Sequence, residues 1–302
     1  MSKFVCICLS PTIQRTALFD YVQVNSVNRS KKYRMDASGK AVNSARVLNQ
    51  LEPGCAVSVC PLGTENCLQF MKLAGRDGMQ IVPVEISGRV RECWTLLDRT
   101  QGTTTELVTD ETSDNFDFTA AQSEFLSVAE AEIEKCSAVL LAGSCPRYFS
   151  GRLPAVIAKM TADKGKVFMA DYCGDSLTGT LALSVPDIIK INEAEFCSTF
   201  DFELFMPEEN LRRAVAEKSR ELNSIVVVTR GKKATFAADK GAAVEFQTEN
   251  VRALNTTACG DSFSAGFLYE YVQTCSLIDA LAKGTWCAAR NAESVVPGSV
   301  KG

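Results

Sequence analysis

The chain has 302 residues, of which 46% are hydrophobic and 23% charged, with a formal net charge of -4 and no histidine. This is the composition of a globular protein large enough for one large α/β domain or two smaller ones. Lys and Arg form no basic stripe, so nucleic acid is not expected as a partner. Without histidine, catalysis would have to use carboxylates, lysines or backbone dipoles.

The N-terminus has too short an apolar run for a signal peptide, and no segment approaches the ~20 apolar residues of a membrane span. We therefore expect a cytoplasmic protein without a membrane partner. Its 13 cysteines are odd in number, scattered and without Cys-x-x-Cys spacing, so neither disulfides nor a zinc site are predicted. We expect most of them to be buried, reduced and packed as small apolar side chains.

The first predicted element is a strand over residues 4–9, whose continuous apolar run is typical of burial on both faces. Residues 16–35 alternate in polarity, which favours strands with one face in water. Residues 93–98 and 103–109 are β-rich runs separated by a glycine-containing turn, which predicts a hairpin. These exposed strands could form a small sheet separate from the main one.

The remaining pattern alternates helices with apolar strands, which predicts parallel βαβ units and a doubly wound sheet. An apolar stripe at helical period follows Gly39 and stops at Pro53-Gly54. The other predicted elements before residue 119 are strands at 56–60 and 80–86 and a helix at 65–74. The later apolar strands are 138–142, 167–171, 187–191 and 225–229. Each ends in polar residues or glycine, at the sheet edge where such folds bind ligands.

Small residues in the segment 255–262 lead directly into an apolar helix. The N–H groups near Ala258, Cys259 and Gly260 would point out of the helix start, where the macrodipole favours a phosphate. Asp261 lies in the first turn and, with an ordinary pKa near ~3.9, would be ionised and able to accept a proton at neutral pH. The alternative is a carboxylate that only caps the helix.

Residues 255–268 resemble the D-T-T-G-A-G-D-S-F-x-A-G-F signature of the ribokinase-like (PfkB) carbohydrate kinases, and Asp261 falls on that family's catalytic base. The resemblance is closest to the 1-phosphofructokinase and tagatose-6-phosphate kinase branch. It implies a three-layer α/β/α sandwich with a mostly parallel sheet. Residues 1–302 would form one domain, with a β-sheet lid built from segments 11–36 and 88–110.

Further motifs of the branch are matched by residues 36–43, 91–107, 143–146, 171–174, 190–195 and 229–231. Positions that match nucleotide-binding residues are Lys190, Asn192, Glu195, Thr229, Gly231 and Asn291. Positions that match acceptor-binding residues are Gln14, Gly39, Lys40, Asn43, Arg91, Ser144 and Asp261. The resemblance implies ATP and Mg²⁺ as cofactors, with Asn192 and Glu195 acting on the metal through water. It also implies that the lid can join a second subunit in a homodimer.

Lys40 and Arg91 would hold a phosphate already present on the acceptor, because paired cations make charge-assisted bonds to a dianion. This predicts an ATP-dependent kinase of a sugar phosphate. Two alternatives stay open: a kinase of an unphosphorylated sugar or nucleoside, and a catalytically weakened sugar or nucleotide sensor.

The sequence departs from the family pattern near the phosphates and the acceptor. Ala258 replaces a glycine, which costs roughly 1 kcal/mol if φ is positive there. Cys259 replaces alanine; a thiol at a helix N-terminus tends toward a lowered pKa, and the alternative is a small buried filler. The other departures are Asn255 for Asp, Gln14 for the sugar-contacting Asp, and Ser38 and Ala41 for glycines.

Overall fold

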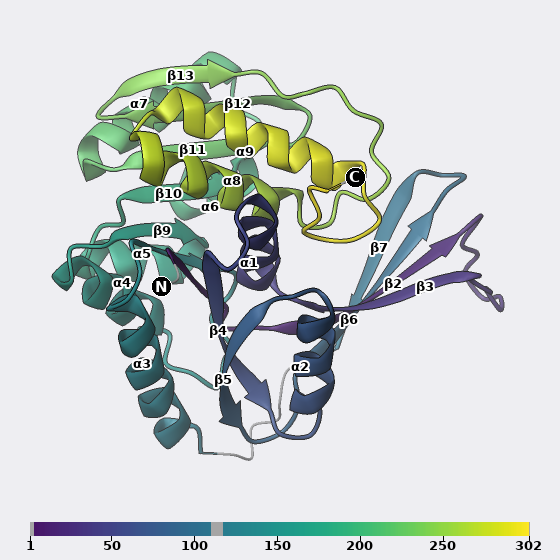
Figure 1. Cartoon of the computed structure of the whole chain (residues 1–302). Coiled ribbons are helices and arrows are strands. Elements are labelled where there is room, and N and C mark those ends of the chain that lie inside the picture. The colour runs from purple at the N-terminus through teal and green to yellow at the C-terminus, as the bar shows by residue number, and fades with distance from the viewer. Residues whose placement is uncertain (1–2, 110–116, 302) are drawn as a thin grey trace.

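In a computed structural model that describes residues 3–109 and 117–301, the main element is a nine-stranded sheet (Figure 1). Its strand order is β13-β12-β11-β10-β9-β8-β1-β4-β5. The strands from β5 to β11 in this order run parallel, and β12 and β13 extend one edge in antiparallel pairs. The bounds are β1 Phe4–Ile7, β4 Ala56–Gly63, β5 Gln80–Ile86, β8 Ala138–Ala142, β9 Val167–Asp171, β10 Ile188–Asn192, β11 Ile225–Arg230, β12 Lys233–Asp239 and β13 Ala242–Phe246.

Helices cover both faces of this sheet. Along β1, Phe4 and Cys6 belong to one core cluster and Val5 and Ile7 to the other, as expected for a strand buried on both sides. The first cluster includes residues of α1 Lys40–Leu51, α2 Cys67–Arg76, α8 Cys259–Thr274 and α9 Leu277–Ala292. The second includes residues of α3 Thr119–Ile133, α4 Leu153–Asp163, α5 Gly174–Leu183, α6 Glu193–Thr199 and α7 Glu208–Leu222. The predicted three-layer α/β/α fold is therefore confirmed.

A second, four-stranded sheet has the order β3-β2-β6-β7 and projects from one side of the molecule (Figure 1). Its strands are β2 Thr12–Phe19, β3 Lys32–Ser38, β6 Arg91–Asp98 and β7 Thr103–Val108. The small separate sheet and the 93–109 hairpin predicted from the sequence are thus present. Residue 110, the end of the second predicted lid segment, lies outside the described residues.

The antiparallel edge of the main sheet was not predicted. β12 and β13 are rich in alanine, which has low β propensity, and their pairing depends on the turn at Lys240-Gly241. The first strand also ends at Ile7 instead of residue 9. All 13 cysteines are free thiols and most are buried, as expected. Among the helices of the described residues, none is long and apolar enough to cross a membrane.

Candidate active site

The segment before α8 turns into the helix through a left-handed residue. Ala258 is the N-cap, with φ of 65° in the left-handed region, where an L side chain costs roughly 1–2 kcal/mol. The N–H of Cys259 donates to the Thr256 carbonyl at 3.2 Å, so it is committed to the turn. The N–H groups of Ala258 and Gly260 have no acceptor within residues 3–109 and 117–301. The positive end of α8 is therefore left with donors available for an anion.

Asp261 lies in the first turn of α8 and is 7% exposed. Its Oδ2 accepts a hydrogen bond from Asn43 Nδ2 at 2.8 Å, and its backbone carbonyl accepts one from Ser44 Oγ at 2.9 Å. Both donors belong to α1, more than 200 residues earlier in the chain. The side chain is thus held between two packed helices.

The pKa of Asp261 is raised to about 6, above the ordinary value that the sequence alone suggested. Burial is the main cause and the negative charge of Asp171 adds to it, while the Asn43 hydrogen bond and the charges of Lys40 and Lys190 oppose the rise. At pH 7 and above the carboxylate is still mostly ionised. It binds a proton more tightly than an exposed aspartate, which suits a general base.

Asp171, at the carboxyl end of β9, is a second buried carboxylate beside the first. Its Oδ2 accepts hydrogen bonds from Ser264 Oγ at 2.6 Å and from Lys190 Nζ at 3.0 Å. Burial would raise the pKa of Asp171, but Lys190 and Lys40 outweigh it and the pKa is lowered. Lys190 Nζ also donates to the Gly260 carbonyl at 3.3 Å. This predicted nucleotide-binding lysine therefore joins β9, β10 and α8.

Lys40 is the first residue of α1, and its Nζ lies 3.9 Å from Asp171 Oδ1 and 3.7 Å from Glu195 Oε1. The charge of Asp171 raises the pKa of Lys40, and Glu195 and Asp261 add to this effect against burial. The preceding Gly39 has φ of 124°, and a Cβ there would lie 2.6 Å from Cys8 Sγ. Glycine is therefore required at the turn that brings Lys40 among these carboxylates.

Asn192 and Glu195 form a capping box at the start of α6. The Asn192 side chain accepts from the Glu195 N–H, and the Glu195 carboxylate accepts from the Asn192 N–H, both at 2.9 Å. The two side chains therefore cap the start of α6. The cap bond uses Glu195 Oε2, and the other carboxylate oxygen, Oε1, lies 3.7 Å from Lys40 Nζ.

The donor set suits a hydrated Mg²⁺ better than a cage made by the protein. No group of three or more His, Cys, Asp or Glu that could hold a metal occurs in the described parts of the chain. Asp171 Oδ1 is buried without a hydrogen-bond donor from those residues, and Glu195 lies across Lys40 from it. Mg²⁺ usually keeps several waters and takes one or two carboxylates plus substrate phosphates, so these two residues fit it.

The predicted acceptor residues outside α1 lie on the small sheet and at the end of β8. Gln14 is buried and its Nε2 donates to Thr95 Oγ1, while Arg91 Nε donates to Thr12 Oγ1 at 2.8 Å. Ser144 is exposed, two residues after the end of β8.

The predicted nucleotide loop follows β11. Thr229 is half-buried in that strand, and Gly231 is exposed with φ of 62° in the turn to β12. Both residues thus lie where β11 reaches the carboxyl edge of the parallel strands.

Asn291 and Cys259 contact one another at the start of α8. Asn291 is 1% exposed; its Nδ2 donates to the Thr257 carbonyl at 2.8 Å and its Oδ1 accepts from the Gly298 N–H at 2.7 Å. The side chain thus joins two loops. Burial raises the pKa of Cys259, so the lowered pKa expected at a helix N-terminus is wrong. The thiol is largely packed inside, as the alternative interpretation held.

Sequence reasoning missed two residues of this cluster, Arg46 and Ser264. Ser264 Oγ donates a hydrogen bond to Asp171 Oδ2, and Arg46 Nη1 donates one to Asn43 Oδ1. The signal for each is spacing: Ser264 follows Asp261 by three residues and Arg46 follows Asn43 by three, which places each pair on one helix face. Polar residues at core-facing positions of an apolar helix could have indicated them.

The fold and this cluster of carboxylates, lysines and free amides at a helix start define a phosphotransferase that acts on an alcohol group. The pfkB family of carbohydrate kinases matches residues 6–299, and the chain belongs to that family. It is a sugar kinase, and the family implies ATP as the phosphate donor.

Solved structures with the same fold include phosphofructokinase-2 from Escherichia coli in complex with fructose-6-phosphate, at 17% identity and TM-score 0.85, covering 97% of this chain and 94% of that one. The same enzyme is known in a tetrameric inhibited form, at 17% identity and TM-score 0.84, with the same coverage. A Thermotoga maritima protein described as a possible 1-phosphofructokinase is 16% identical with TM-score 0.87, covering 97% and 92% of the two chains. At such identities the likeness concerns the fold.

Proposed function

We propose that this chain transfers the γ-phosphate of ATP to a hydroxyl of a sugar phosphate, with Asp261 as the general base. The observation that carries the proposal is the buried carboxylate of Asp261 in the first turn of α8, with its raised pKa and with Lys40 and Lys190 near it. Phosphoryl transfer needs positioning and charge neutralisation more than covalent help. This cluster supplies both.

In the proposed mechanism, the N–H groups of Ala258 and Gly260 receive the γ-phosphate at the positive end of α8. Asp261 accepts the proton of the attacking hydroxyl as the new O–P bond forms. Lys40 neutralises charge on the transferred group from its position beside Asp171 and Glu195. Asp171 and Glu195, with Asn192 beside them, would hold Mg²⁺ through water, and the metal would supply positive charge to the phosphates of ATP.

The position of Lys40 bears on the acceptor. Because its ammonium group lies between Asp171 and Glu195, Lys40 is better suited to the transferred phosphate than to the acceptor's own phosphate. Arg91, on β6 of the small sheet, then becomes the main candidate for that phosphate. The small sheet would close over the acceptor and exclude water, which otherwise competes for the γ-phosphate.

The small sheet also supports the proposal of a homodimer. One of its faces presents Tyr33, Trp94 and Leu107, which are 50%, 38% and 55% exposed. Sedimentation velocity with wild type and Leu107→Glu would test it, since a charge on that face should give monomers.

An ATP-consumption screen over hexose phosphates, unphosphorylated hexoses and nucleosides tests the activity. Turnover only with a hexose phosphate, and a KM for it that rises at least about 10-fold in Arg91→Met, would support the proposal. Turnover with nucleosides or free hexoses, at a KM that Arg91→Met leaves unchanged, would instead indicate a kinase of an unphosphorylated sugar or nucleoside. Binding of ATP and sugar without turnover would instead indicate a sensor.

A further inference from the structure

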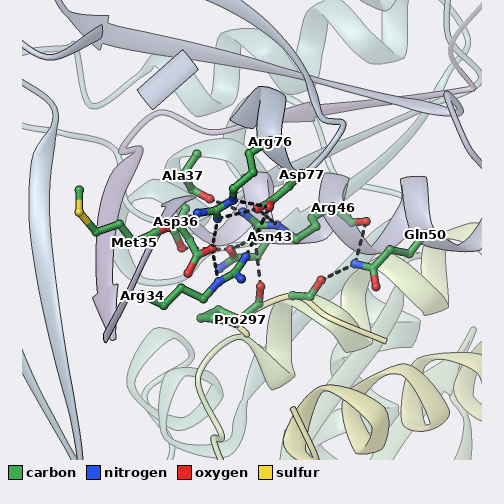
Figure 2. Close-up of polar contacts among 12 residues, drawn as sticks. Arg34, Met35, Asp36, Ala37, Asn43, Arg46, Gln50, Arg76, Asp77 and Pro297 are labelled. Atoms are coloured by element: carbon green, nitrogen blue, oxygen red, sulfur yellow. Dashed lines mark hydrogen bonds and ion pairs between the residues drawn. The ribbon is translucent and has the colours of Figure 1, made fainter. Parts of the chain in front are cut away.

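Arg46, one turn beyond Asn43 in α1, extends the polar cluster away from the candidate base. It is only 4% exposed. Its Nη1 donates to Asn43 Oδ1 at 2.9 Å and to the Pro297 carbonyl at 3.0 Å, and its Nη2 donates to the carbonyl of Ala37 at the end of β3. Figure 2 shows the guanidinium lying among these groups. Arg46 thus joins three separate segments next to Asn43.

These contacts fix which way the Asn43 carboxamide faces. A guanidinium has donors only, so it can bond Asn43 solely through the carbonyl oxygen. Ser38 Oγ donates to the same Oδ1 at 3.0 Å. The amide nitrogen is therefore the atom that faces Asp261 Oδ2, at 2.8 Å. A carboxamide turned the other way would set an oxygen against the ionised carboxylate and repel it.

Acidic partners hold Arg46 in place from the opposite side. Asp77 Oδ2 lies 3.3 Å from Arg46 Nε. Asp36, on β3 of the small sheet, is fully buried and accepts from Arg34 Nε and Arg76 Nη2, each at 2.7 Å. Figure 2 shows these acidic and basic side chains around Arg46. The charges of Asp36 and Asp77 offset part of the cost of burying this guanidinium, although burial still lowers the pKa of Arg46.

We propose that Arg46 is a positioning residue for the phosphotransfer: with Ser38, it locks the Asn43 carboxamide in the orientation that donates to Asp261 and so favours the ionised, proton-accepting form of the base. Ser38 stands where the family pattern has glycine, so the second bond to Asn43 is a feature of this chain. The inference rests on the proposed function only in taking Asp261 as the base.

Other charged groups face the same side chains and must be kept constant in a test. Those that act on Asp261 are Asp171 from β9, Lys40 from α1, Lys190 from β10 and Cys259 from its own helix. Those that surround Arg46 are Asp36 and Arg34 from β3, Arg76 from the end of α2, and Asp77 directly after it. A test variant should therefore be compared with one that removes the same charge from the same acidic partners.

The test compares Arg46→Gln with Arg76→Gln, because both lose one positive charge beside Asp36 and Asp77 but only Arg46 touches Asn43. We expect the acidic limb of the kcat profile to move up by about one pH unit in Arg46→Gln, with the rate largely restored at pH 9. At pH 6 this is a loss of about 5-fold. Arg76→Gln should leave the acidic limb of the kcat profile at its wild-type pH.

Ser38→Ala is the second variant, since it changes no charge and should fold even if Arg46→Gln does not. It should move the limb in the same direction by a smaller amount. A ¹³C NMR titration of the Asp261 carboxyl carbon should show the same upward movement in both variants, whether or not an acceptor is known. An equal loss of rate at every pH, or an unchanged titration in Ser38→Ala, would overturn the inference. A wild type inactive on every acceptor would count against the proposed function alone.

Discussion

The charge state of Asp261 makes a quantitative prediction about stability as well as activity. Its pKa rises from an ordinary 3.8 to about 6 in the folded protein. Each unit of pKa difference between the folded and unfolded chain corresponds to about 1.4 kcal/mol. Keeping this carboxylate ionised therefore costs the folded state about 3 kcal/mol. Asp261→Asn should remove that cost and keep the hydrogen bond from Asn43 Nδ2, because asparagine offers a carbonyl oxygen to it.

The sign of the effect follows from the raised pKa. Below pH 3.8 the wild-type carboxyl is protonated in both the folded and the unfolded chain, so the variant gains nothing. Above pH 6 the carboxyl is ionised in both, and the full cost of burial applies. The gain in unfolding free energy for Asp261→Asn should therefore be about 1.6 kcal/mol at pH 5 and about 3 kcal/mol at pH 8. Turnover should fall by a factor of ~100 or more, with ATP binding nearly intact.

Urea unfolding of wild type and Asp261→Asn at pH 5 and pH 8 measures the gain in unfolding free energy. Isothermal titration calorimetry measures the affinity of both proteins for ATP. Asp163→Asn is a matched control, because Asp163 is exposed in an i,i+4 pair with Lys159 and should change stability by less than about 1 kcal/mol. A gain of equal size at both pH values, or a loss of stability at pH 8, would refute the assignment of Asp261 as a penalised buried charge. Wild-type turnover would refute its role as the base.

Three further changes test the surroundings of the base. Ala258→Gly should raise the unfolding free energy by about 1 kcal/mol, because glycine adopts the positive φ without strain. The control Ala265→Gly, inside α8, should lower the unfolding free energy. The melting temperatures of the two variants and wild type measure both effects. Lys190→Met should destabilise the fold by about 3–5 kcal/mol, since it leaves Asp171 buried without its closest cation; a urea midpoint equal to wild type would contradict this. Saturating ATP should slow alkylation of Cys259, measured by mass spectrometry, and equal labelling with and without nucleotide would place the nucleotide elsewhere.

The parts of the fold that could be predicted are those where local pattern and tertiary structure agree. β1 is apolar on both faces because it is central, and the helix after Gly39 begins where the glycine allows a positive φ. The capping box of Asn192 and Glu195 is readable from its spacing alone. The cost of Ala258 was also foreseeable, because glycine is the usual residue at positive φ.

What could not be predicted depends on contacts between distant segments. In the sequence, Asp171 is an ordinary carboxylate at the end of a strand, and nothing local indicates that it is buried. The raised pKa of Asp261 likewise comes from burial under α1 and from Asp171, neither of which is a neighbour in the chain. The inward orientation of Asn291 could not be predicted for the same reason: its partners Thr257 and Gly298 lie on loops that only the fold brings together.

The two bonds from Asn43 and Ser44 to Asp261 have a consequence for how the protein moves. They join α1 to α8, so the turn at Gly39 and the proposed base Asp261 move together as one rigid unit. In the proposed mechanism, the acceptor hydroxyl would therefore reach the carboxylate through bending of the projecting strands, because relative sliding of these helices would break both bonds. Hydrogen exchange of the backbone amides should accordingly be slow where α1 packs on α8 and faster toward the tips of β2 and β3.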